Sequence, residues 1–321
     1  MTIRMTSLLT ALALLFAGPA VGQSIPGGTG TPATLSPTSL DHCGAVRDRV
    51  ESLIGLPTAR GDQPAGCPVL CKDGYIHRFD PETQVPEWVL EYLTPARFVG
   101  PGDRKEQGDP FAADPDIPGE CKSTSPIPDD YRNTGFDRGH MSAAANNKFT
   151  EAAMEKSFFM TNMAPQVGIG FNRGIWANLE EITREWACER GELIVVSGPI
   201  YDSRPPELVV KRPKSQPAEE GQVSKPTAFF KVAYDPRRER AVALILPNAR
   251  IDLKKRTAWD VLRDYTVSIQ EVEFRTGLDL FPNLPDGMEQ TLESLDGLLW
   301  PDRDRCERVL PALERAAAQG G

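Results

Sequence analysis

Short apolar runs that stop at turn residues recur along the chain and predict β-strands. One run covers residues 76–79 and ends at Asp80 and Pro81, a pair that favours a turn. A second apolar run at residues 88–90 follows this turn. Because that run is so short, its pattern fits a strand or a helix.

Two runs in the second half of the chain predict a pair of adjacent strands. They cover residues 228–234 and 241–246, and the segment between them is polar and basic, as in the turn of a hairpin. Residues 193–196 are rich in β-branched side chains and predict another strand, which we expect to end at the Ser-Gly-Pro sequence that follows.

Helical periodicity appears at residues 151–160 and 179–187, where apolar side chains recur every three or four positions. The chain is also expected to be mainly helical after Asn248. Residues 101–130 are polar and rich in proline, which predicts a long loop, and such loops are often functional. Residues 204–225 predict a solvated insertion.

The composition is that of an ordinary globular protein. The 321 residues are 40% hydrophobic and 25% charged, enough for one large domain or two modest ones. The net charge is −9. Proteins that only bind nucleic acid usually have a basic surface, so this charge counts against a pure binding module. It counts less against a hydrolase, which must release its product.

The N-terminus has the pattern of an export signal. Arg4 precedes a short apolar stretch at residues 8–16, and the small residues Ala20 and Gly22 suit a cleavage site. The stretch is short for a membrane span, although a retained anchor is the alternative. We therefore predict a periplasmic or secreted protein with no membrane contact after cleavage.

Six cysteines remain in the expected mature chain, and an even number in an exported protein suggests disulfides. Sequence alone leaves 15 pairings open. Cys67 and Cys71 could instead bind a metal with His77, but a closed zinc site needs four ligands and only one histidine is near.

Candidate chemistry begins with histidine, because the chain has only three: His42, His77 and His140. Histidine is the side chain best suited to act as a general base near neutral pH. His140 follows Arg138 in an Asp-Arg-Gly-His sequence, which combines a proton acceptor with a guanidinium suited to phosphate. A histidine near such residues is often structural, so the downstream residues matter.

Asn172 and Glu180 lie eight residues apart around a predicted helix. If Asn172 stands at the start of that helix, two helical turns bring both side chains to one face. An amide oxygen and a carboxylate could then hold Mg²⁺, which keeps several of its waters. The alternative is an asparagine cap and a solvated glutamate.

Several motifs occur in a fixed order along residues 70–285. They are Trp88-Val89-Leu90-Glu91, Asp137-Arg138-Gly139-His140, Asn162-Met163-Ala164-Pro165-Gln166, Trp176-Ala177-Asn178-Leu179-Glu180, Ser197-Gly198-Pro199, and the segments 226–232 and 276–282. With them the chain resembles the DNA/RNA non-specific endonuclease family. The resemblance implies an α+β, ββα-metal fold with a central antiparallel sheet flanked by helices and a helical C-terminal extension.

The resemblance also implies roles for single residues. His140 matches the general base, with Arg138, Glu180, Asn162 and Arg104 as the other catalytic residues.

Asn172 and Glu180 match the metal site, which implies Mg²⁺, with Mn²⁺ as a substitute. Arg138, Arg173 and Asn178 are the expected substrate-binding residues. The expected partners are DNA and RNA, a second copy of the chain in a homodimer, and an inhibitor protein.

The sequence thus predicts five segments: a signal peptide at 1–22, a flexible linker at 23–40, a Cys-containing extension at 41–64, an endonuclease domain at 65–285 and a helical extension at 286–321. We expect a secreted, Mg²⁺-dependent hydrolase that leaves 5′-phosphate ends and has little sequence preference. Two alternatives stay open: a phosphodiesterase of small nucleotides, and a non-catalytic secreted binding module.

Overall fold

The computed structural model describes residues 42–60, 67–104, 109–122, 125–214, 217–294, 298–301 and 304–319. All of them belong to one compact unit. The predicted signal peptide and linker, residues 1–22 and 23–40, lie outside the described residues. Among the helices that are described, none is both long enough and apolar enough to cross a membrane.

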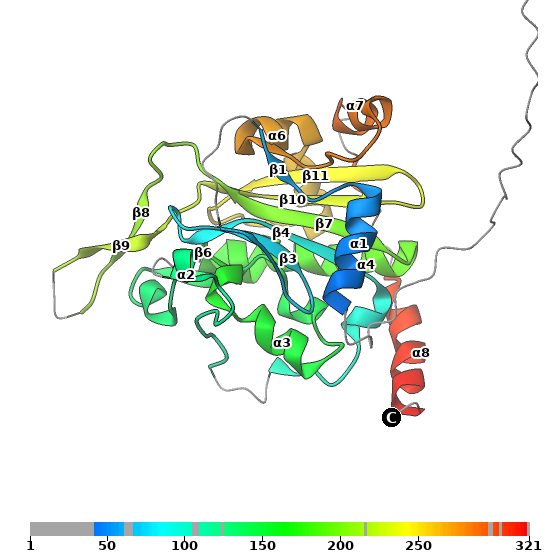
Figure 1. Cartoon of the computed structure of the whole chain (residues 1–321), viewed down its shortest axis with the longest axis horizontal. Helices are drawn as coiled ribbons and strands as arrows, with labels where there is room; N and C mark the ends of the chain where they lie inside the picture. The colour runs from blue at the N-terminus through cyan, green and yellow to red at the C-terminus, as the bar shows by residue number, and fades with distance from the viewer. Residues whose placement is uncertain are drawn as a thin grey trace, which may run out of the picture. The chain divides into compact units, whose positions relative to one another are not determined.

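A seven-stranded sheet forms the centre of this unit (Figure 1), with the strands in the order β12-β11-β10-β7-β4-β3-β2. Every neighbouring pair is antiparallel, which confirms the predicted sheet. The strands are β2 (Val69–Cys71), β3 (Ile76–Asp80), β4 (Val85–Leu93), β7 (Leu193–Ile200), β10 (Ala228–Asp235), β11 (Arg240–Pro247) and β12 (Thr266–Val267).

The predicted strand pair is present as β10 and β11, with Val232 opposite Ala243. The apolar run at 88–90 belongs to the long strand β4. One boundary was predicted too early, because β7 continues through Pro199 to Ile200. At Pro199 the strand has β10 as its paired neighbour, while its pairing with β4 reaches only Ser197. Proline is tolerated where one side of a strand is unpaired.

Alternation along the strands gives the sheet two buried faces. Phe229 and Ala233 of β10 pack in one core cluster with helix α4, whereas Phe230 and Val232 pack in another with α1 and α6. Figure 1 shows α6 and α7 on one side of the sheet and α3 and α4 on the other. A short hairpin of β5 (Phe136–His140) and β6 (Met163–Val167) lies on the α4 side.

The helices are α1 (His42–Leu53), α2 (Gly119–Lys122), α3 (Glu151–Ser157), α4 (Ala177–Arg190), α5 (Ala258–Leu262), α6 (Ile269–Thr276), α7 (Asp286–Ser294) and α8 (Cys306–Gln319). Short 3₁₀ or π segments are η1 (Pro95–Phe98), η3 (Pro128–Tyr131), η4 (Ala144–Asn146), η5 (Met160–Asn162), η6 (Gly168–Trp176) and η7 (Arg263–Tyr265). The helices predicted near 151–160 and 179–187 correspond to α3 and α4.

The segments outside the predicted endonuclease domain are packed onto it. Helix α1 buries Val46 and Val50 against the sheet, as does Ile54 directly after the helix, and β1 (Thr58–Ala59) pairs with β13 (Leu278–Asp279). The predicted insertion 204–225 contains a hairpin of β8 (Leu208–Lys211) and β9 (Glu219–Ser224). Apolar side chains explain why α1 is part of the fold and not a free extension.

Disulfides join distant parts of the chain, as the even number of cysteines suggested. Cys67 is bonded to Cys121 and Cys188 to Cys306, and Cys71 is also disulfide-bonded. The second bond ties α8 to α4. The alternative of a metal site at Cys67, Cys71 and His77 is therefore excluded, since a disulfide sulfur is not a thiolate ligand.

Candidate active site

A pocket of about 680 Å³ opens between the β5–β6 hairpin, the segment η6 and the start of α4. It brings together most of the residues that the sequence singled out. The predicted site residues that line it are Arg104, Arg138, His140, Asn172, Arg173 and Glu180. They come from four separate stretches of the chain, so only the folded protein assembles them.

His140 ends strand β5, opposite Met163 of β6. Its ring packs edge-on against Phe158, with the ring centres 4.9 Å apart, and lies 5.8 Å from the ring of Phe111. Atom Nε2 is buried and finds no hydrogen-bond partner among the described residues. Burial, and then the charges of Arg104 and Arg138, lowers the pKa of His140 to about 3. The imidazole is therefore neutral and able to accept a proton at neutral pH.

Two arginines stand beside this histidine. The guanidinium of Arg138 stacks on the ring of Phe111 at 3.8 Å and forms an ion pair with Asp109 at 3.4 Å. Arg104 lies 5.4 Å above the ring of Phe158. Since cations over aromatic faces are held in place without losing their charge, both remain able to attract a phosphate.

Asn172 does not stand at the start of α4, so the predicted geometry of two helical turns is wrong. It lies in η6, and the backbone leaves helical angles at Arg173 and Gly174 before α4 begins. Gly174 has φ −143° and ψ −111°, which places a kink between Asn172 and Glu180. Both side chains nevertheless line the same pocket.

Asp137 orients the amide of Asn172, and sequence reasoning missed this role. Nδ2 of Asn172 donates to Oδ2 of Asp137 at 2.9 Å, and the same oxygen accepts from Nε of Arg173 at 2.9 Å. Because the NH₂ group is used in this contact, the amide oxygen Oδ1 is left for another partner. The Asp-Arg-Gly-His motif contained Asp137, but only the fold shows what it contacts.

Glu180 lies in the first turn of α4. Burial raises its pKa to about 7, while the charges of Lys231 and Arg184 lower it in part. A carboxyl group in such an environment gains strongly from a nearby cation. Strong shifts of opposite direction in His140 and Glu180 within one pocket are typical of functional sites.

Two predicted site residues lie outside the pocket. Asn162 is fully buried and uses its whole amide: Oδ1 accepts from Ser142 N, and Nδ2 donates to the carbonyls of Ser142 and Ser157. It thus holds the turn that follows His140 and has no group left for substrate. Asn178 donates to the carbonyl of Gly174 and lines a different pocket, so its position does not fit substrate binding.

The donors present suit a hard cation better than a soft one. Among the described residues, no group of three or more His, Cys, Asp or Glu side chains could hold a metal. The pocket offers instead the Oδ1 of Asn172 and the carboxylate of Glu180. Mg²⁺ is often bound through one or two protein oxygens and several waters, so this sparse oxygen set fits it.

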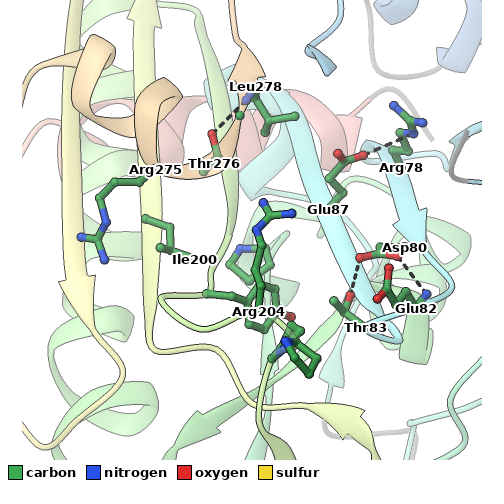
Figure 2. Close-up of a pocket in the computed structure, with 15 residues that line it drawn as sticks. Arg78, Asp80, Glu82, Thr83, Glu87, Ile200, Arg204, Arg275, Thr276 and Leu278 are labelled. Carbon is green, nitrogen blue, oxygen red and sulfur yellow. Dashed lines mark hydrogen bonds and ion pairs between the residues drawn. The ribbon is translucent and has the colours of Figure 1, made fainter. Parts of the chain in front are cut away.

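A second pocket, of about 430 Å³, contains none of these residues (Figure 2). Arg78, Glu87 and Arg204 line it together with Asp80 and the start of β13. Arg78 is paired with Glu87 at 3.2 Å, and Asp80 caps the turn at Glu82 and Thr83. Three arginines and three carboxylates line it, so its charges balance, and no histidine is among its lining residues.

Comparison with known proteins identifies the family of the chain. A family model described as DNA/RNA non-specific endonuclease matches residues 58–287. The chain belongs to the DNA/RNA non-specific endonuclease family. It is therefore a hydrolase of the endonuclease class, as the sequence predicted.

Individual members of the endonuclease family show how far the likeness extends. The chain is 34% identical over 233 residues to nuclease C1 of Cunninghamella echinulata var. echinulata, covering 70% of this chain and 86% of that protein. It is 33% identical over 216 residues to mitochondrial endonuclease G of Homo sapiens, covering 66% and 69%. A crystal structure of the EndoG/EndoGI complex matches with a TM-score of 0.56 and 27% identity, covering 70% of this chain and 89% of that one.

The relatives contradict the predicted periplasmic or secreted location. Endonuclease G of Homo sapiens and a nuclease of Saccharomyces cerevisiae are both named as mitochondrial, and such names point to mitochondria and not to export. The prediction rested on Arg4, the short apolar stretch at residues 8–16 and the small residues Ala20 and Gly22. Mitochondrial transit peptides are also basic and poor in acidic residues, so this composition did not separate the two destinations.

Proposed function

We propose that this endonuclease hydrolyses the phosphodiester bonds of DNA and RNA in a Mg²⁺-dependent reaction with His140 as the general base. One observation carries the proposal: a neutral imidazole, an amide oxygen and a carboxylate that suit a cation, and several arginines line a single pocket. A base, a cation site and counter-charges for phosphate are the groups that this hydrolysis needs.

His140 takes the proton of a water molecule as that water attacks phosphorus. Because Nε2 is buried, Nδ1 is the nitrogen left to act as the base. The low pKa of His140 keeps the ring unprotonated, although it also makes the imidazolium costly to form. The negative charge of a phosphate bound next to the ring favours the imidazolium and is expected to reduce this cost.

Arg138 and Arg104 lie beside His140 and attract the phosphate. Arg138 must exchange its partner, because its guanidinium is paired with Asp109, whose side chain is 69% exposed. An exposed ion pair of this kind is weak, so a phosphate can replace the carboxylate. Stacking on Phe111 keeps the guanidinium in place during the exchange.

Asn172 and Glu180 would hold Mg²⁺ through oxygen atoms, with Asp137 keeping Oδ1 of Asn172 directed away from itself. When bound, the ion supplies Lewis-acid stabilisation of the leaving oxygen. Arg173 is paired with Asp137 and 63% exposed, which suits a contact with substrate outside the reacting phosphate.

None of these groups is aimed at base edges. Contacts to phosphate carry no direct sequence information, so we propose broad specificity. A water nucleophile makes no use of a ribose 2′-hydroxyl, which allows both DNA and RNA to be cut. The expected products carry 5′-phosphate and 3′-hydroxyl ends.

Cleavage of supercoiled plasmid and of a structured RNA, with Mg²⁺ or with EDTA, tests the proposal. His140→Ala should lose on the order of 10²- to 10⁴-fold in rate, the usual contribution of a general base. His77→Leu is the matched control, since His77 is buried elsewhere in the fold. Near-full activity of His140→Ala, or cleavage of a dinucleotide ester without cleavage of the polymers, would refute it.

Two partners remain proposals. The matched crystal structure is that of a complex described as a mechanism of EndoG inhibition, so we propose that an inhibitor protein can cover this pocket as well. A homodimer is the other. Light scattering of the purified protein, with and without added candidate inhibitor, measures both.

A further inference from the structure

A lysine lies in the apolar core below the pocket. Lys231 is in strand β10, an inner strand of the seven-stranded sheet, and is only 2% exposed. It lies on the same face of the strand as Phe229 and Ala233, which pack against α4. Burying an ammonium group is costly unless it is well compensated, so its presence needs a reason.

The ammonium group is held by a hydroxyl and an aromatic face. Nζ donates to Oγ of Ser197 at 2.6 Å and lies 4.8 Å from the centre of the Trp176 ring. Among the described residues, no carboxylate forms an ion pair with it within 4.0 Å. Lys231 is thus fixed in direction without being neutralised by direct contact.

Trp176 connects this lysine to both halves of the proposed site. Its indole Nε1 donates to the backbone carbonyl of His140 at 3.3 Å. The same side chain hydrogen-bonds the carboxylate of Glu180. The indole therefore joins the end of β5 to the first turn of α4, and its ring is fully buried beneath them.

A second buried carboxylate completes the arrangement. Glu91 of β4 is 1% exposed and accepts from Oγ of Ser142 at 2.8 Å and from Nδ2 of Asn146 at 3.1 Å. Lys231 interacts electrostatically with both Glu91 and Glu180. The buried cation is thus electrostatically coupled to a carboxylate that supports the turn after His140 and to the carboxylate of the pocket.

Stability alone does not explain this group. Replacing buried ions by apolar side chains of similar volume is often neutral or stabilising. A central strand of a packed sheet would accommodate a methionine at position 231 with similar length. The contacts of Lys231 lead instead, through Trp176, to His140 and Glu180, the base and the cation-binding carboxylate of the proposed reaction.

We propose that Lys231 is a positioning residue: with Ser197 it fixes the Trp176 indole, whose N–H holds the His140 strand and the Glu180 carboxylate at their working separation. The inference rests on the proposed function of the pocket. It assigns Lys231 no contact with substrate. Its effect passes through Trp176 to the base on one side and to the cation site on the other.

The test compares Lys231→Met, Trp176→Phe and the double variant. Each single change should lower kcat roughly 10- to 100-fold and leave KM nearly unchanged, as is usual when a support of a metal site is removed. Mn²⁺ affinity, measured on the metal-free protein by electron paramagnetic resonance, should weaken by a similar factor. Because both residues act through one indole N–H, the double variant should be no worse than the poorer single variant.

Lys72→Met is the matched control. Lys72 is also 2% exposed, but it pairs with Asp114 and Asp116 and does not line the pocket. It should lose thermal stability and keep kcat and Mn²⁺ affinity when measured well below its melting temperature. If Lys231→Met does not fold, Ser197→Ala removes only the hydroxyl that directs the ammonium and should reproduce the fall in kcat and in Mn²⁺ affinity.

Wild-type kcat in Lys231→Met, multiplicative losses in the double variant, or equal losses in Lys72→Met would each overturn the inference. A failure of the proposed function looks different. In that case the wild-type protein cleaves no nucleic acid, while Mn²⁺ affinity still shows whether Lys231 supports the cation site.

Discussion

Asp137 offers the sharpest test of how the pocket presents an oxygen to a cation. Its Oδ2 accepts from Nδ2 of Asn172 and from Nε of Arg173, both at 2.9 Å. Asp137→Asn keeps the size of the side chain but introduces an NH₂ group. That group can donate to Oδ1 of Asn172, which would reverse the amide and turn its NH₂ toward the cation site.

The expected loss of Mg²⁺ affinity in Asp137→Asn is that of one metal ligand that is no longer oriented. Partners that orient a metal ligand are typically worth about 10- to 100-fold in affinity, or roughly 1.4 to 2.7 kcal/mol. The loss of the Asp137–Arg173 ion pair adds little to this effect, because the guanidinium is 63% exposed and screened by water. We therefore expect the Mg²⁺ concentration for half-maximal activity to rise by about 10- to 100-fold, with most of kcat recovered at saturating Mg²⁺.

A plasmid-nicking assay over a Mg²⁺ titration measures this shift. Asp129→Asn is the control, because Asp129 lines the same pocket and pairs with Arg132 without contacting Asn172. A Mg²⁺ titration of Asp137→Asn that superimposes on that of the wild type would show that the amide is not oriented by Asp137. A loss of kcat that high Mg²⁺ does not restore would equally refute the reasoning.

Three further predictions concern stability and substrate affinity. Burial and the charge of Lys72 lower the pKa of His77 to about 3, against 6.5 for the unfolded chain. Unfolding therefore takes up a proton between these two values, and the free energy of unfolding falls as pH drops from about 6.5 toward 3. His77→Leu should reduce that slope by up to about 1.4 kcal/mol per pH unit in urea unfolding at several pH values, and parallel curves would contradict it. Replacing Cys188 and Cys306, which are 118 residues apart, by serine should lower the free energy of unfolding by about 2–5 kcal/mol. Calorimetry should show a lower Tm while kcat at 15–20 °C stays near wild type. An unchanged Tm would show that α8 is held by other contacts. Phe111→Leu removes the aromatic ring on which the Arg138 guanidinium stacks at 3.8 Å. It should lower kcat/KM about 2- to 5-fold, the equivalent of about 0.5–1 kcal/mol. An unchanged kcat/KM would mean that Asp109 alone places the guanidinium.

Sequence patterns located the strands that pair with near neighbours along the chain. The runs at 228–234 and 241–246 form β10 and β11 because each is an apolar run of strand length and a short polar turn joins them. The same patterns placed the end of β7 too early, since Pro199 is tolerated only because β4 stops pairing at Ser197. Where a strand ends depends on its neighbours, which local propensity does not describe.

The sequence predicted the residue types that carry the chemistry of this endonuclease. They are a histidine two positions after an arginine, and an asparagine and a glutamate further along the chain. Their order and spacing were sufficient for the family. Tertiary structure alone decided which of them share a pocket, because the kink at Gly174 sets the directions of Asn172 and Glu180. It also placed Asn178 at a different pocket, where its side chain donates to the carbonyl of Gly174. The contacts of Asp137 and Lys231 have the same origin: a hydrogen bond depends on distances between segments far apart in sequence, and only the packed sheet and helices set those distances.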